Sequence, residues 1–123
     1  MVGAVIFSIA ALLAICLHLA LVLGAPIGFM TMGGRNPGVL PPKARVASFL
    51  QAVLLAGFIA IVLQRAGLVE FEPNLSWLIW IVVAVSAVSL VANSITPSKR
   101  ERLFGVPAAL GFLVGSTLVA LGE

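Results

Sequence analysis

Four long apolar stretches dominate this chain of 123 residues and restrict it to one broad class of fold. They cover residues 2–23, 44–64, 75–94 and 100–121. At about 1.5 Å per residue, each is long enough for a hydrocarbon core of about 30 Å. Hydrophobic residues make up 62% of the chain and charged residues 9%, whereas about 25% of residues are charged in soluble domains. We therefore expect an all-α membrane protein whose single transmembrane domain, residues 1–123, crosses the bilayer four times.

The basic residues predict the orientation of these four helices. Six of the seven Lys and Arg residues lie in or beside two connections, and Arg65 is the exception. The six are Arg35, Lys43, Arg45, Lys99, Arg100 and Arg102. Because basic loops stay in the cytoplasm during insertion, we expect an antiparallel four-helix transmembrane bundle with both termini outside. We also expect these six residues to bind anionic lipid headgroups.

The first connection, residues 24–43, is rich in Gly and Pro and is too apolar at residues 27–32 for a fully solvated loop. We expect this cytoplasmic loop to fold against the end of the bundle, and the sequence leaves open whether it is re-entrant. Ser98 and Glu101 have the spacing of a capping box at the start of the fourth span. Pro107 is expected to bend or break that helix.

Polar side chains within the spans are the best pointer to a site, because buried polar atoms are costly in lipid. His18, Gln51 and Asn93 lie on three different spans, each toward the cytoplasmic end. Ser86 and Ser89 share a helix face with Asn93. We expect these five residues to form a polar cluster in the cytoplasmic leaflet. A single histidine in a span is more often a hydrogen-bonded packing residue than a catalytic one. We therefore assign no catalytic residue to this cluster.

Close helix packing is the other feature of the spans. Gly111 and Gly115 form a GxxxG pattern, which lets another helix approach closely. Cys16 is the only cysteine and points about 200° away from His18 on a helix, so the two cannot share a metal ion. We expect no metal and no cofactor. The basic residues lack the interleaved aromatics of a nucleic-acid site, so we expect no nucleic-acid partner.

Two segments resemble those of small bacterial four-span membrane proteins. They are Pro37-Gly38-x-Leu40-Pro41-Pro42-x-x-Arg45 and Asn93-x-x-Thr96-Pro97-Ser98-x-x-Glu101-Arg102, the latter followed by Pro107. The resemblance covers most of the chain. It implies a bacterial cytoplasmic membrane and four spans, but no activity and no site residues.

Three functions remain open. The leading hypothesis is a non-enzymatic protein that binds lipid or a partner membrane protein through its basic cytoplasmic face, because the spans lack the embedded charges of a coupled transporter. The second is a homo-oligomeric transporter or channel for small solutes, dimerised through Gly111 and Gly115. The third is an enzyme that modifies a lipid or isoprenoid, with His18 as acid or base and Arg35 or Arg45 holding phosphate.

Overall fold

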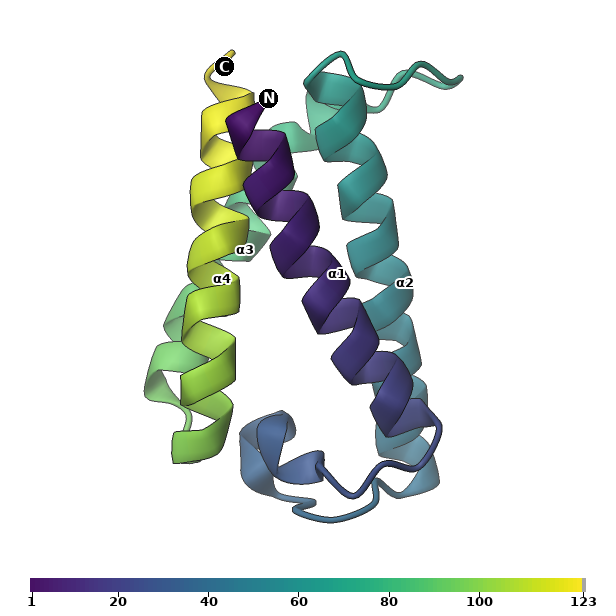
Figure 1. Cartoon of the computed structure of the whole chain (residues 1–123), viewed down its shortest axis with the longest axis vertical. Coiled ribbons are helices and arrows are strands. Elements are labelled where there is room, and N and C mark those ends of the chain that lie inside the picture. The colour runs from purple at the N-terminus through teal and green to yellow at the C-terminus, as the bar shows by residue number, and fades with distance from the viewer. Residues whose placement is uncertain (123) are drawn as a thin grey trace.

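The computed structural model describes residues 1–122 and shows four long helices joined by three connections (Figure 1). The long helices are α1 (Val2–Val22), α2 (Pro42–Arg65), α3 (Ile79–Ile95) and α4 (Lys99–Ala120). Three short 3-10 helices are η1 (Gly28–Met30), η2 (Met32–Gly34) and η3 (Ser76–Leu78). Residues 1–122 contain no strand. All four long helices, α3 taken together with η3, are long and apolar enough to cross a membrane.

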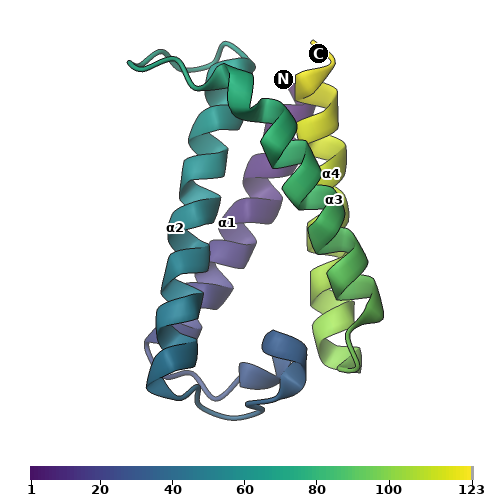
Figure 2. The ribbon, with the colours of Figure 1, turned by 180° about the vertical axis from the view of Figure 1, so that it is seen from behind.

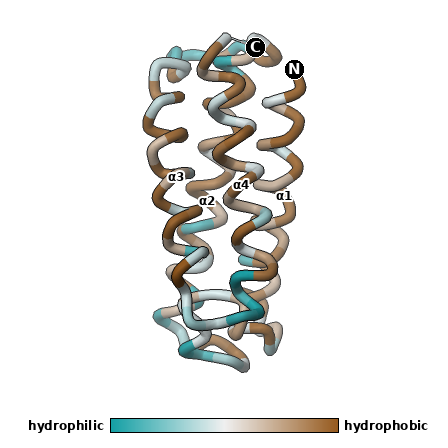
Figure 3. The backbone as a smooth tube through the Cα atoms, turned by 90° about the vertical axis from the view of Figure 1, so that its left-hand side faces the viewer, coloured by the Kyte–Doolittle hydropathy of each residue, from teal (hydrophilic) through white to brown (hydrophobic). Residues whose placement is uncertain are grey.

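The chain turns back after each long helix, so its path runs along the long axis of the molecule four times (Figures 1 and 2). The start of α1 and the end of α4 lie at one end of the molecule, and the loop 24–41 lies at the other. Figure 3 shows hydrophilic residues gathered mainly at the two ends, with largely hydrophobic helices between them. The helix ends fall within two residues of the expected spans, except that η3 forms the first turn of the third.

α4 is the central packing element: it lies along α1 on one side and along α3 on the other. α1 also packs along α2, whereas α2 and α3 make few contacts with each other. The α1–α4 contact is very close, because a Cβ atom built on Gly115 would lie 2.7 Å from the carbonyl oxygen of Gly3. The rings of Phe7 and Phe112 pack beside it, with 5.5 Å between centroids. The glycine pattern of α4 therefore serves packing within the chain.

The end of α2 illustrates how the sequence terminates these helices. Gly67 follows the helix with a φ of +76°, a left-handed conformation that glycine adopts without steric penalty. Arg65, in the last turn of α2, donates from Nη2 to the carbonyl oxygen of Ala120 at 2.9 Å. This places a positive charge at the C-terminal end of α4, where it complements the helix dipole. The one basic residue outside the two basic connections thus joins two helices.

The first turns of α4 have the expected cap at Ser98 but differ from expectation at Glu101 and at Pro107. Ser98 caps the helix, since its Oγ accepts from the amide of Glu101 at 3.2 Å. However, Glu101 does not complete a capping box: its Oε2 accepts from the amide of Gly33 at 2.7 Å, in the loop 24–41. The carboxylate is drawn toward the loop because the loop folds under this end of α4. Pro107 lies inside α4, which continues through it without a break.

Candidate functional site

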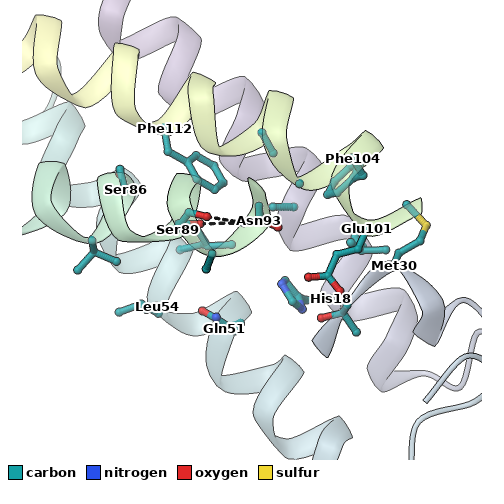
Figure 4. Close-up of a pocket in the computed structure, with 18 of the residues that line it drawn as sticks. His18, Met30, Gln51, Leu54, Ser86, Ser89, Asn93, Glu101, Phe104 and Phe112 are labelled. Carbon is teal, nitrogen blue, oxygen red and sulfur yellow. Dashed lines mark hydrogen bonds between the residues drawn. The ribbon is translucent and has the colours of Figure 1, made fainter. Parts of the chain in front are cut away.

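A cavity of about 600 Å³ lies inside the bundle and is lined by all four helices and by the loop 24–41 (Figure 4). Its volume is within the range of roughly 300–1,000 Å³ that is usual for small-molecule sites. The five residues expected to form a polar cluster, His18, Gln51, Ser86, Ser89 and Asn93, all line it. Residues far apart in the sequence are thus brought together. Their role in binding remains a prediction.

The side chains of Asn93 and Ser86 on α3 donate hydrogen bonds within that helix. Asn93 donates from Nδ2 to the carbonyl oxygen of Ser89 at 2.8 Å, and the same nitrogen donates to the hydroxyl oxygen of Ser89 at 3.2 Å (Figure 4). Ser86 donates from Oγ to the carbonyl oxygen of Val82 at 2.7 Å. These local bonds lower the cost of exposing polar atoms to an apolar cavity. The side chain of Gln51, in contrast, makes no hydrogen bond within residues 1–122, and the residue is exposed.

The imidazole of His18 is positioned by a residue of the neighbouring helix. Its Nδ1 lies 2.9 Å from Oγ of Ser48, which is fully buried on α2. This contact leaves Nε2 as the nitrogen that can meet a ligand. Ser48 is absent from the expected cluster, although it precedes Gln51 by three residues and therefore shares its helix face.

Glu101 and the loop 24–41, which was expected to fold against this end of the bundle, also line the cavity. Residues 30–32 form the floor of the cavity at the loop end, and the Glu101 side chain lies beside them (Figure 4). Two bonds hold the loop there: Glu101 accepts from the Gly33 amide, and Oγ of Ser98 donates to the carbonyl oxygen of Phe29 at 2.9 Å. Both depend on tertiary contact across more than 60 residues, so local spacing could not show them.

The basic residues surround this end of the molecule but do not enter the cavity. All seven Lys and Arg residues belong to the described part of the chain, and none lines it. Arg45 and Arg102 donate to the backbone carbonyl oxygens of Leu40 and Thr96. Arg100 lies 4.7 Å from the centroid of an aromatic ring in the loop. The other three basic residues at this end, Arg35, Lys43 and Lys99, are exposed; Arg65 lies at the opposite end of α2.

The cavity becomes apolar away from the loop. His18 and Phe7 mark its two ends on α1, and Glu101 and Phe112 mark them on α4. Each pair is separated by eleven positions, which corresponds to about 16 Å along a helix. The polar-to-apolar axis of the cavity therefore covers about half of a hydrocarbon core of about 30 Å.

One side of the cavity faces outward between α2 and α3, the two helices that scarcely touch. Leu54 on α2 is 45% exposed, and Val85 and Val88 on α3 are 40% and 68% exposed, although all three line the cavity. In a membrane this apolar rim would meet lipid chains rather than water. The cavity is thus open laterally, at the depth of the helices.

Metal chemistry has no ligand set here: within residues 1–122, no group of three or more His, Cys, Asp or Glu side chains could hold an ion. Cys16 is exposed on α1 and is not among the residues that line the cavity. Comparison of the chain with protein-family models, curated proteins and solved structures gives no match.

Proposed function

We propose that this protein binds one amphiphilic, lipid-like molecule in the cavity that opens between α2 and α3. The main support is the order of polarity along the cavity. His18, Gln51 and Glu101 lie at the loop end, and Phe7 and Phe112 lie about 16 Å away toward the middle of the helices. A lipid in one leaflet has the same order, with its headgroup at the surface and its chain toward the midplane. The lateral opening lets such a molecule enter from the bilayer.

In this proposal the helices form an antiparallel transmembrane bundle in a bacterial cytoplasmic membrane, with both termini outside. Six basic residues lie at the loop end of the molecule, and the retention of basic loops in the cytoplasm puts that end on the inner face. The polar end of the cavity then lies in the cytoplasmic leaflet. Arg35, Lys43 and Lys99 are exposed there and contact the anionic headgroups of the surrounding bilayer.

A homo-oligomeric transporter dimerised through Gly111 and Gly115 has less support. A Cβ atom on Gly111 would lie 2.9 Å from Cβ of Ala10, and Gly115 is similarly close to Gly3. Both glycines face α1 of the same chain, so a second copy could use this surface only by displacing α1. A lipid-modifying enzyme would need the same binding step that we propose, and this makes binding the step to test first.

Blocking the opening should remove the bound molecule. Ala47 lines the cavity and is exposed, so Ala47→Phe places a ring at its opening with little cost to packing. Ala56→Phe is the matched control, because Ala56 is an exposed alanine of the same helix that does not line the cavity. After mild extraction, native mass spectrometry should show one retained amphiphile on the wild type and on Ala56→Phe. Ala47→Phe should retain at least about tenfold less.

Two results would overturn the proposal. One is equal retention by the two phenylalanine variants. The other is a wild-type protein without bound amphiphile whose opening is covered by a second copy or by a partner membrane protein.

A further inference from the structure

The lining of the cavity points to a particular class of headgroup, and this inference rests on the function proposed above. We infer that the bound amphiphile has a headgroup that donates hydrogen bonds and is not anionic: a hydroxyl or an amine, and not a phosphate. The basic residues on the surface at the same end of the molecule favour anionic headgroups. We therefore expect the cavity and the surface around it to bind different headgroups.

Charge is the first argument. The carboxyl group of Glu101 is the only acidic group among the lining residues, and none of the seven Lys and Arg residues joins it. A phosphate entering this partly buried space would lose water and would face a carboxylate with no Lys or Arg side chain to compensate. An amine would be paired by the same carboxylate, and a hydroxyl would have an acceptor.

The second argument concerns the groups that could otherwise hold an anion. The N-terminus of α4 points toward the loop, and helix N-termini and loop amides commonly bind phosphate. Here one amide of each is already engaged by the chain itself. Oγ of Ser98 accepts from the amide of Glu101 at 3.2 Å, and Oε2 of Glu101 accepts from the amide of Gly33 at 2.7 Å. The carboxylate of Glu101 thus sits where an anionic headgroup would need to bind.

The third argument is the supply of acceptors for a donating headgroup. Oε2 of Glu101 is used by Gly33, which leaves Oε1 for a ligand. The amide oxygen of Gln51 is free, since the side chain of Gln51 makes no hydrogen bond within the described residues. Figure 4 shows Glu101 and His18 in the same part of the cavity and Gln51 apart from them, nearer Leu54. A donating headgroup can therefore bind Oε1 of Glu101, and the amide oxygen of Gln51 is a second acceptor in the same cavity.

Three probes with the same chain isolate the headgroup: oleyl alcohol, oleylamine and oleyl phosphate. Each is titrated into delipidated full-length protein in neutral detergent, and occupancy is measured by native mass spectrometry. We expect the alcohol and the amine each to bind at least about tenfold more tightly than the phosphate. Tighter binding of the alcohol would identify a neutral headgroup, and tighter binding of the amine would identify a cationic one. Ala47→Phe should remove binding of all three, which shows that the probes occupy the cavity.

Glu101→Gln tests the residue responsible and keeps an oxygen that can accept from Gly33. We expect it to strengthen binding of oleyl phosphate about tenfold, to weaken oleylamine about tenfold, and to change oleyl alcohol less than about threefold. Lys43→Gln is the control: it removes a charge from the same end of the molecule, but Lys43 is exposed and does not line the cavity. It should leave the order of the three probes unchanged.

The outcomes distinguish this inference from the function on which it rests. If oleyl phosphate binds best and Ala47→Phe still blocks it, the headgroup assignment is wrong and lipid binding stands. If Lys43→Gln, rather than Glu101→Gln, changes the order in which the three probes bind, the basic surface selects the headgroup and the inference fails. If no probe binds the wild type, or if Ala47→Phe has no effect on binding, the proposed function itself fails.

Discussion

Gly115 and Gly57 are both glycines in the interior of a helix, but they have opposite surroundings. A Cβ atom on Gly115 would lie 2.7 Å from both the carbonyl oxygen of Gly3 and the amide nitrogen of Phe7. A Cβ atom on Gly57 would meet nothing within 4 Å. In lipid, apolar burial does not drive helices together, so backbone approach of this kind supplies much of the packing energy. The same substitution at the two positions should therefore change stability in opposite directions.

We expect Gly115→Ala to destabilise the protein by about 1–3 kcal/mol, because the added methyl group forces α1 and α4 apart. Gly57→Ala should instead stabilise it by up to about 1 kcal/mol, since alanine favours the helix and fills open space. Thermal unfolding of the two variants in the same detergent measures both effects. Equal midpoints for the two variants would show that α1 and α4 are not in close contact at Gly115.

At the scale of elements, the loop 24–41 is the least regular part of the chain, yet it closes one end of the cavity. It is held against α4 by Ser98, whose Oγ donates to the carbonyl oxygen of Phe29, and by the bond from Gly33 to Glu101. Ser98 has a double role, because the same oxygen caps α4. Removing it should therefore loosen the loop and the start of the helix together.

Ser98→Ala should increase amide hydrogen exchange in residues 28–34 about tenfold. It removes a helix cap worth about 0.5–2 kcal/mol and a hydrogen bond worth about 0.5–1.5 kcal/mol, which lowers the free energy of local opening. Ser94→Ala is the matched control, because Ser94 is exposed and its Oγ donates only to Leu90 in its own helix. Exchange that stays at the wild-type rate in Ser98→Ala would mean that other contacts hold the loop.

The residues of the cavity show what local sequence could and could not predict. The grouping of His18, Gln51 and Asn93 was predictable, because position along a span sets depth in the membrane and polar atoms at one depth tend to face one another. The contribution of Glu101 was not, because its spacing from Ser98 matches a capping box and its actual partner, Gly33, lies 68 positions away. Helix positions follow from hydrophobicity and length, whereas the route of an irregular loop depends on tertiary contacts that no local pattern encodes.

At the scale of the whole molecule, the wide separation of α2 and α3 gives the bundle its function in our proposal. α4 packs along both α1 and α3, and α1 packs along α2. Three of the four neighbouring pairs are therefore closed by direct packing, and the fourth pair, α2 and α3, is open. The glycine contacts lie in a closed pair and the exposed apolar lining lies in the open one. A bundle with four equally tight pairs would leave no lateral entrance for a lipid.

The orientation of the whole bundle can be tested with two cysteines that leave every charge in place. In a Cys16→Ser background, Val39→Cys lies in the loop 24–41 and Val69→Cys lies in the connection after α2; both positions are exposed and lie at opposite ends of the molecule. Because six basic residues lie at the loop end, a membrane-impermeant maleimide should label Val69→Cys in cells with a permeabilised outer envelope and an intact inner membrane. It should label Val39→Cys only after the inner membrane is broken.

The reverse pattern would place the loop and the polar end of the cavity in the outer leaflet. The cavity would keep its lateral opening and its gradient of polarity in that case, since neither depends on orientation, but its ligand would have to come from the other side of the bilayer.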